Sequence, residues 1–389
     1  MNILIQSHSS GDTGSDFSLR EIVHYLSSNG NNVYLCLPVT CDKEFVKTLA
    51  IPNKNIIYLK PSIWHKTKIK GFFSNVYMIL YRLYKTKGGV FYTVPKLLFF
   101  LFKNKINIVH SNSFVLIDSA IAAKLLRIPH IQHIREIIYG ENPNFTFFLQ
   151  SRPKIFKRMM SFLHAKIVFN SLFVYNNSKS FFPPNNHDVL NNSFSDKMYD
   201  LNYKKAQNIS AIGLVANVTS DCKNHIAFLE IARVSKELKL NLKFFIYGKL
   251  PNKYNKYYQS LKNFIDKHNL NDYVEFKGYC DNLIIFKNID ILIHTNDKET
   301  FGRVYIEAMI FKTPIICIKS DAANELIYNG ENGFIIDEMN PRLFVDVIKK
   351  LMNDHDMYLN VIDNAFKKSL EYKTSSVNKK LNVIYKSIL

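Results

Sequence analysis

Two glutamates, Glu299 and Glu307, stand eight positions apart, and a glycine, Gly302, lies between them. The apolar run at residues 289–294 is short and rich in β-branched side chains, so it predicts a buried strand, and residues 314–318 predict the next one. The order is then strand, loop, helix, strand, with Glu299 in the loop at the carboxyl end of the first strand. Open α/β sheets bind their ligands at that edge.

The start of the intervening helix has the chemistry of an anion site. We expect this helix to begin near Phe301, where the first backbone amides have no acceptor inside the helix and can hold a phosphate. These amides belong to Gly302, Arg303 and Val304. Glu307 then lies roughly one to two turns further along, within reach of the ribose hydroxyls of a nucleotide. Glu299 stays on the far side of the phosphates, where a transferred group would lie. An arbitrary pair of acids at this spacing is more often a solvated loop acid and a surface helix acid.

The segment resembles the E-x7-E motif of retaining nucleotide-sugar glycosyltransferases of family 4, the glycosyl transferases of group 1. The shared pattern comprises Glu299, Phe301, Gly302, Ala308, Met309 and Pro314, followed by Glu325 and by Gly330-x-x-Gly333. The resemblance implies the GT-B fold, an α/β architecture in which two doubly wound Rossmann-like domains face a central cleft. It also implies that Glu307 holds the ribose hydroxyls, and that Glu299 binds the donor sugar and stabilises an oxocarbenium-like centre. The chain departs from the pattern at Asp321 and Ala322, where the family often has a glycine pair.

The amino-terminal stretch predicts a parallel sheet. Residues 2–8 and 33–37 read as strands, and a loop and a helix lie between them, which is a βαβ unit. In the family, a glycine pair in this first loop lets the backbone approach the reacting centre. Here the pair is Thr13-Gly14, so the resemblance carries over only Gly14 as a donor-binding residue.

A further strand is predicted at residues 129–135, and its period of two puts His133 and Arg135 on one face. Family members often have a histidine near the end of this strand, facing the donor sugar. In this chain Arg135 stands at that place with His133 one step inside it, and the resemblance makes both of them candidates for a catalytic role. A histidine or arginine on a strand is otherwise more often a structural residue.

The second domain begins with a predicted strand at residues 212–217. In the loop after this strand the family has an arginine and a lysine, six positions apart, that clamp the donor diphosphate. Lys223 matches the lysine, and Asn217 stands where the arginine would be. One cation is therefore missing from the donor-binding set, and Arg303 at the mouth of the phosphate cradle is a candidate to replace it.

The 389 residues, 47% of them apolar, suit two domains. We expect an acceptor-facing and membrane-facing domain at 1–195, a nucleotide-sugar-binding domain at 209–372, and a last helix at 373–389 that packs back on the first domain. The five cysteines lack any C-x-x-C spacing, which argues against a disulfide framework or a zinc site. The D-x-D sequence Asp354-His-Asp356 falls in a charged helical segment, so we expect neither a metal nor another cofactor.

The net charge is +19, and residues 45–117 contain no acid but twelve Lys or Arg, interleaved with Phe and Tyr. The helical patterns at 72–84 and 90–102 have the composition of segments that lie in the lipid headgroup layer. The sequence has no apolar stretch of about 18 residues, and its apolar start is too short for a signal peptide. We therefore expect a cytoplasmic protein that is peripheral at the inner face of an anionic membrane.

These features together predict a metal-independent, retaining hexosyltransferase that moves a sugar from a nucleotide diphosphate sugar to a glycan. We expect a lipid-linked acceptor, in the synthesis of a surface polysaccharide such as capsule or O-antigen. A nucleotide-sugar 2-epimerase shares the fold and would need no acceptor. A basic nucleic-acid-binding protein is the non-enzymatic alternative, but no recognised binding module accompanies the basic residues, so we expect no nucleic-acid partner.

Overall fold

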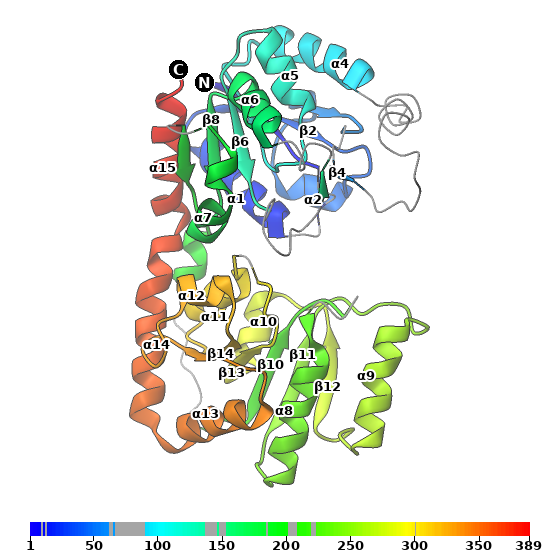
Figure 1. The fold of residues 1–389 in the computed structure, drawn as a ribbon, viewed down its shortest axis with the longest axis vertical. Helices are drawn as coiled ribbons and strands as arrows, with labels where there is room; N and C mark the ends of the chain where they lie inside the picture. The colour runs from blue at the N-terminus through cyan, green and yellow to red at the C-terminus, as the bar shows by residue number, and fades with distance from the viewer. Residues whose placement is uncertain are drawn as a thin grey trace. The chain divides into compact units, whose positions relative to one another are not determined.

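In the computed structural model the chain forms two compact units (Figure 1). Unit 1 consists of Met1–Ser195 and Tyr372–Leu389, and unit 2 of Asp196–Glu371. The structure describes residues 1–8, 11, 14–61, 65–66, 90–136, 146–147, 153–183, 186–200, 208–218, 223–299 and 301–389. No helix in this described part is long and apolar enough to span a membrane.

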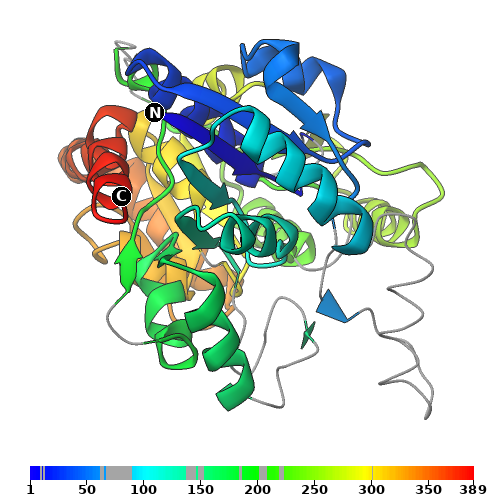
Figure 2. The ribbon, with the colours of Figure 1, turned by 90° about the horizontal axis from the view of Figure 1, so that it is seen from above.

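Unit 1 is built on a parallel sheet with the strand order β3-β2-β1-β5-β6-β8-β9. The strands are β1 Asn2–Gln6, β2 Asn32–Leu37, β3 Ile56–Tyr58, β5 Ile108–Ser111, β6 His130–Ile134, β8 Lys166–Phe169 and β9 His187–Val189. Figure 2 shows β1 and β2, in blue, side by side, with Ile3 opposite Val33. A separate antiparallel pair joins β4 His65–Lys66 to β7 Thr146–Phe147.

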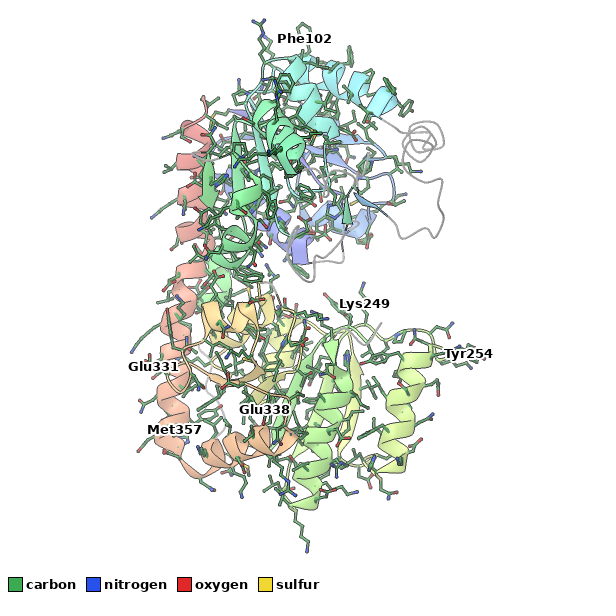
Figure 3. The ribbon with its side chains drawn as sticks, in the orientation of Figure 1. Phe102, Lys249, Tyr254, Glu331, Glu338 and Met357 are labelled. Atoms are coloured by element: carbon green, nitrogen blue, oxygen red, sulfur yellow. The ribbon has the colours of Figure 1, made fainter. Side chains whose placement is uncertain are left out.

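Helices cover both faces of this sheet. They are α1 Gly14–Ser28, α2 Lys43–Thr48, α4 Val90–Lys103, α5 Asp118–Leu125, α6 Pro153–Leu163, α7 Leu172–Ser178 and α15 Thr374–Lys386, with 3-10 turns at Asn53–Asn55 and Lys179–Phe181. Because side chains alternate along a strand, Ile3 and Ile5 pack with α1 and α15, whereas Leu4 packs with α4 and α5. Phe102, near the end of α4, projects from its helix into solvent (Figure 3).

Helix α15 packs on α1 and completes the core of unit 1 with the buried Leu381 and Ile384. Lys373 is the N-cap residue of α15 and makes no side-chain cap bond. The chain entering α15 is held by backbone bonds instead. The amide of Phe194 donates to the carbonyl of Tyr372, and the amide of Thr374 donates to the carbonyl of Phe194, each at 2.9 Å.

Unit 2 contains a second parallel sheet, with the order β12-β11-β10-β13-β14-β15. Its strands are β10 Ala211–Val215, β11 Lys243–Tyr247, β12 Val274–Gly278, β13 Ile291–His294, β14 Ile315–Ile318 and β15 Phe334–Ile336. The strand order reverses between β10 and β13. This reversal creates a switch point between their carboxyl ends, the place where sheets of this kind bind ligands. Lys223 follows β10, and Glu299 follows β13.

The helices of unit 2 are α8 His225–Glu237, α9 Lys256–Lys267, α10 Asn282–Lys287, α11 Arg303–Ile310, α12 Asp321–Leu326, α13 Pro341–Asn353 and α14 His355–Ser369. Turns of 3-10 helix lie at Asp196–Tyr199 and Leu370–Tyr372. Residues of α8 and α13 share one large core cluster with the buried faces of β10, β11 and β13, including Phe228, Phe244 and Phe344.

The predicted α/β class with two parallel sheets is confirmed. Two local details differ from the sequence-based expectation. Helix α11 begins at Arg303, two residues beyond Phe301, because Gly302 takes a left-handed conformation at the N-cap. Helix α1 begins at Gly14, so this glycine opens the helix instead of lying in the loop before it. The helical pattern at 72–84 lies outside the described residues.

Candidate active site

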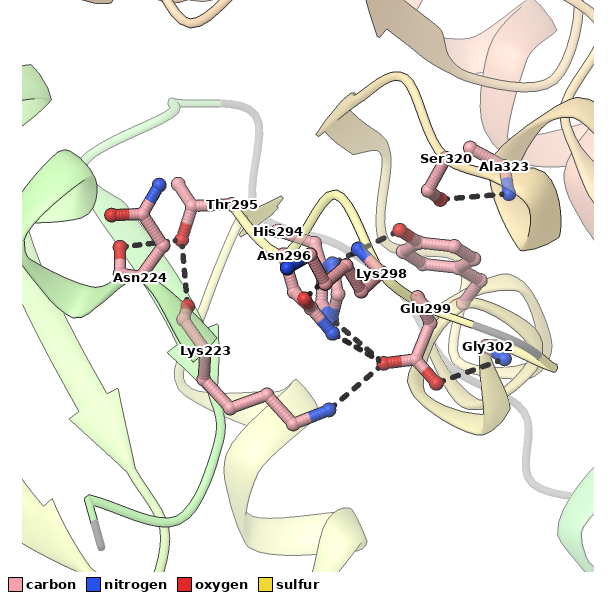
Figure 4. Close-up of polar contacts among 11 residues, drawn as sticks. Lys223, Asn224, His294, Thr295, Asn296, Lys298, Glu299, Gly302, Ser320 and Ala323 are labelled. Atoms are coloured by element: carbon pink, nitrogen blue, oxygen red, sulfur yellow. Dashed lines mark hydrogen bonds and ion pairs between the residues drawn. The ribbon is translucent and has the colours of Figure 1, made fainter. Parts of the chain in front are cut away.

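The loops that follow β10 and β13 meet at the switch point of unit 2. The hydroxyl of Thr295, directly after β13, lies 3.2 Å from the carbonyl of Lys223 and 3.0 Å from that of Asn224, and can donate to either. Asn224 caps α8 in a left-handed conformation, with φ 50°. These contacts hold Lys223 beside the loop that carries Glu299 (Figure 4).

The Glu299 carboxylate accepts three hydrogen bonds. Its Oε2 accepts from Lys223 Nζ at 2.9 Å and from Asn296 Nδ2 at 3.2 Å, and its Oε1 accepts from the Gly302 amide at 3.3 Å (Figure 4). The amide of Ala322 donates to the Glu299 carbonyl at 3.1 Å, which ties the loop to α12. Glu299 is therefore held in one place. It is not a solvated loop acid, which was the alternative that the spacing of the two acids left open.

The neighbours of Glu299 fix its charge. Burial by itself raises the pKa of this carboxyl, but Lys223, His294 and the hydrogen bond from Asn296 outweigh burial and lower the pKa to about 2. Burial lowers the pKa of His294 to about 4, so its imidazole is neutral at pH 7. The Nδ1 atom of His294 lies 2.9 Å from the Tyr305 hydroxyl. At neutral pH the site thus holds an ionised acid in direct contact with a lysine.

Gly302 shapes the start of α11. Its φ of +72° lies in the left-handed region, and a Cβ added here would lie 2.5 Å from Cδ2 of Tyr305, so only glycine fits without strain. The Gly302 amide, which we expected to bind phosphate, donates to Glu299 Oε1 in this structure. Arg303 and Val304 occupy the first two positions of the helix. The expected phosphate cradle is therefore partly occupied by the protein's own carboxylate.

Glu307 lies in the second turn of α11 and is buried. Arg303 Nη2 lies 3.4 Å from Glu307 Oε1 and donates to it. Burial raises the pKa of Glu307, although Arg303 and a hydrogen bond from Asn282 at the start of α10 both favour its ionised form. A carboxylate in this setting is a strong acceptor for ligand hydroxyls, since a charged acceptor makes stronger hydrogen bonds than a neutral one.

Asn217, which stands where the family has an arginine, joins two loops. Its Oδ1 accepts from the Lys249 amide at 2.8 Å. Gly248, directly before Lys249, has φ +145°, and a Cβ there would lie 2.2 Å from the carbonyl oxygen of Ala216. The close approach of β10 and β11 therefore requires glycine. Figure 3 shows Lys249 on the loop that follows β11, a second lysine at this edge of the sheet.

In unit 1, Arg135 and His133 meet at the carboxyl end of β6. Nε and Nη2 of Arg135 donate to Asn112 Oδ1 at 3.1 and 2.7 Å, and Nη1 donates to Asn192 Oδ1. Nη2 also lies 3.3 Å from His133 Nδ1. The two side chains share one face, as the alternation along the strand predicts. Because a guanidinium has no acceptor, His133 Nδ1 must be the acceptor in this contact.

His133 belongs to a buried chain of hydrogen bonds. His110 Nε2 lies 3.3 Å from His133 Nδ1, and His110 Nδ1 lies 2.8 Å from the hydroxyl of Tyr385 in α15. With His133 Nδ1 as an acceptor, His110 Nε2 donates, and His110 Nδ1 accepts from Tyr385. Burial lowers the pKa of both histidines, that of His110 to about 3, so both are neutral at pH 7. Arg135 is then the charged member of the group.

Gly14 is exposed at the first position of α1, and its carbonyl accepts from the hydroxyl of Ser18 at 3.2 Å. Nearby, the Gly11 amide donates to the buried Asp16 carboxylate at 3.2 Å. Gly11 has φ +117°. The Gly11 amide is thus tied to the first turn of α1.

Sequence reasoning missed the residues that hold the predicted ones in place. They are His110, Asn112 and Asn192 near Arg135, and Asn282, His294 and Asn296 near the two glutamates. The sequence held a signal for two of them, because His294 ends the predicted strand at 289–294 and Asn296 follows it closely. Among the described residues no group of three His, Cys, Asp or Glu side chains is placed to bind a metal. Asp354 of the D-x-D sequence caps α14.

Comparison with known proteins places a family match on unit 2. Residues 203–368 match the family model of the glycosyl transferases group 1. The chain is 30% identical over 103 residues to the capsular polysaccharide biosynthesis glycosyltransferase CapM of Staphylococcus aureus, covering 26% of this chain and 27% of that protein. It is 29% identical over 117 residues to the poly(glycerol-phosphate) alpha-glucosyltransferase of Bacillus subtilis, covering 30% of this chain and 17% of that protein. These matches span under a third of either relative.

Solved structures resemble the whole chain. The crystal structure of Anabaena HepE in complex with UDP-glucose aligns with a TM-score of 0.77 at 18% identity, covering 100% of both chains. A mutant of S. aureus TarM in complex with Fondaparinux, alpha-GlcNAc-glycerol and UDP aligns with a TM-score of 0.72 at 14% identity, covering 99% of each chain. At such low sequence identity, these structural alignments support the fold alone. Residues 203–368 therefore form a glycosyl transferases group 1 domain, in a chain whose two parallel sheets have the GT-B fold.

Proposed function

We propose that this protein is a retaining glycosyltransferase that transfers a sugar from a nucleotide diphosphate sugar to a glycan and needs no metal ion. The observation that carries the proposal is the contact of Lys223 with Glu299 at the switch point, inside the segment that matches the glycosyltransferase family. The reaction needs a cation for the leaving diphosphate and an anion for the positive charge that develops on the sugar. Lys223 and Glu299 supply one of each.

Lys223 and the start of α11 would stabilise the diphosphate as its bond to the sugar breaks, because this step adds negative charge to the leaving oxygen. Without ligand, Lys223 binds Glu299, so an arriving diphosphate competes for Nζ and frees the carboxylate to face the sugar. With a pKa of about 2, Glu299 remains ionised at neutral pH. The acceptor attacks the face that the diphosphate leaves, and a donor phosphate oxygen takes the acceptor's proton.

Glu307 would orient the donor by accepting from its ribose hydroxyls, and Arg303 and Asn282 hold the carboxylate ready for this role. In unit 1 we assign the contact with the donor sugar to Arg135, the charged member of its group. His133 is then a positioning residue, since it is buried and accepts from Arg135.

The names of the relatives and structural neighbours indicate which donor and acceptor to test first. Solved neighbours hold UDP and UDP-glucose, and one relative is named for capsular polysaccharide biosynthesis. A UDP-sugar is therefore the first donor to test. We propose a growing surface polysaccharide on a lipid carrier as the acceptor. Such an acceptor lies at a membrane, so the protein would work as a peripheral protein at the cytoplasmic face.

A thermal-shift screen with UDP, GDP and ADP and their sugars identifies the donor, because a ligand that binds only the folded state raises the unfolding midpoint. The best donor is then incubated with lipid-linked acceptors, with and without EDTA, and the products are identified by mass spectrometry. We expect free nucleoside diphosphate and a glycan one sugar longer. The yields of both products should be the same with and without EDTA. The proposal would be refuted if no nucleotide raised the unfolding midpoint, or if the donor alone were converted into an epimerised sugar nucleotide.

Glu299→Ala separates the role of this acid from simple donor binding. The variant should retain its affinity for the nucleoside diphosphate, since Lys223 loses only a competing partner, but its turnover should fall about a hundredfold or more. Calorimetry and a coupled assay for the released nucleotide measure the two quantities. Normal turnover of this variant would show that Glu299 is only a loop anchor.

A further inference from the structure

Helix α4 of unit 1 exposes large aromatic side chains. Phe91, Phe99 and Phe102 are 79%, 68% and 75% exposed, and Tyr92 is half exposed. Their helical spacing puts them on one face of the helix. A surface helix normally has a polar outer face, so aromatic rings on the outer face of α4 indicate a partner that covers them.

The inner face of α4 is already used. Leu97 and Leu101 are fully buried and pack in one cluster with Ala122 and Ala123 of α5. The exposed rings are therefore not needed to hold α4 on unit 1. They remain available for contact with another molecule.

Helix α5 packs beside α4, and α6 packs beside α5, and both expose further apolar side chains. Leu125, Ile155 and Phe162 are each more than half exposed. Lys124 Nζ lies 4.4 Å from the centroid of the Phe162 ring, and this contact joins the end of α5 to α6. We call these three residues and the exposed aromatic residues of α4 the α4–α6 face.

Among the described residues of α4, α5, α6 and the turns after α4 and α5, the exposed charged side chains are all basic. They belong to Lys96, Lys103, Lys105, Lys124, Arg127, Lys154 and Arg158. The acid within residues 90–135, Asp118, is buried. Lys96 Nζ lies 3.9 Å from the centroid of the Tyr92 ring, so its stem lies along apolar surface while its ammonium stays accessible.

We propose that the α4–α6 face docks on an anionic lipid bilayer, with its aromatic rings at the boundary of headgroups and acyl chains and its lysines among the headgroups. The uniform positive charge favours an anionic partner and disfavours a second copy of the same face, since two copies would bring like charges together. Nucleic acid would attract the lysines, but it offers no apolar phase into which the exposed phenylalanines could insert. This inference adds a membrane-binding surface to the proposed function. It rests on the proposed function only for the idea that the acceptor is linked to a lipid.

Sedimentation with lipid vesicles tests the docking, without donor or acceptor. The protein should pellet with vesicles of phosphatidylglycerol and phosphatidylcholine, remain in solution with pure phosphatidylcholine, and be released by salt, which screens surface charge. The variant F91S/F99S/F102S should bind at least about tenfold more weakly, since it loses the inserted rings. The variant K96Q/K103Q/K105Q should bind about a hundredfold more weakly, at about fivefold per charge.

A matched control removes three exposed apolar side chains from unit 2, in the variant L238S/Y254S/L359S, and should bind vesicles as the wild type does. Unfolding midpoints show that each variant is folded. Stabilisation by nucleotide is measured separately, so failure of docking is distinguished from failure of the proposed function. Unchanged vesicle binding by F91S/F99S/F102S, or equal loss in the control, would overturn the inference. Self-association that F91S/F99S/F102S abolishes, without vesicle binding, would assign the face to a second copy instead.

Discussion

The ion pair between Lys223 and Glu299 allows a prediction with a magnitude. The pKa of Glu299 falls from 4.5 to about 2. Since one pKa unit corresponds to about 1.4 kcal/mol, the surroundings stabilise the ionised carboxylate by about 3 kcal/mol. Lys223 shares this effect with His294 and Asn296, and 34% of its side chain is in solvent. Solvent screening weakens the pair further, so we expect a coupling free energy of about 1–2 kcal/mol.

A double-mutant cycle on the full chain measures this coupling. Lys223→Met, Glu299→Gln and the double variant are unfolded in urea without nucleotide, followed by circular dichroism. The stability that ionised Glu299 contributes is fully present above pH 4.5 and is lost as the pH falls toward about 2, because the unfolded carboxyl takes up its proton first. The coupling energy should therefore be equal at pH 7 and pH 6 and smaller at pH 3.

The ion pair of Lys312 and Asp363, 3.2 Å apart in the same unit, is the matched control, because its lysine is as exposed as Lys223 but its carboxylate is 58% exposed. Its cycle, with Lys312→Met and Asp363→Asn, should give about 0.5 kcal/mol or less, the usual strength of a surface pair. A coupling energy for Lys223 and Glu299 no larger than this control, or one that does not change between pH 7 and pH 3, would refute the reasoning. The diphosphate would then have no ion pair to displace.

Three further predictions follow from the same structure. Glu307→Gln should weaken nucleotide binding by about 1.5–3 kcal/mol, because an amide is a poorer acceptor for two hydroxyls; an unchanged Kd by calorimetry would exclude the ribose role. Gly302→Ala should lower the free energy of unfolding by about 1–3 kcal/mol, through its left-handed φ and its contact with Tyr305; an unshifted urea midpoint would contradict this. Unit 1 should lose stability as the pH falls below 6.5, because burial lowers the pKa of His110 and His164 to about 3 while unfolded histidines take up protons. Urea titrations at pH 7 and pH 5 should differ by about 2 kcal/mol for each of these two histidines, and equal results would mean that their imidazoles are solvated.

Local sequence was enough to predict the α/β class and the loop position of Glu299. Both depend on residues close together in the chain: an apolar strand, a glycine and a helix start. The contact of Lys223 with Glu299 joins residues 76 positions apart, and no local pattern says which loops meet. The resemblance gave these two residues separate roles, and only the fold showed that each is the other's partner before a ligand arrives.

Burial was the other property that the sequence did not contain. The period of two placed His133 and Arg135 on one face, but the exposure of a strand residue depends on the helices that cover it. His133 is buried within a chain of contacts that ends at Tyr385, 275 positions beyond His110. Glu307 looked like a surface helix acid in isolation, and it is buried because α10 and Arg303 lie against it.

Unit 1 is composed of two segments separated in the chain by all of unit 2, and this order has a consequence during synthesis. Leu19 and Ile22 of α1 are made long before the α15 residues Leu381 and Ile384 that cover them. At roughly 5–20 residues per second, the delay between Ser195 and Tyr372 is about 10–35 s. Unit 2 is continuous in the chain and can complete its core first. A growing chain therefore presents an uncovered α1 surface to chaperones throughout that interval, and translation that stops before residue 372 leaves a finished unit 2 joined to an open unit 1.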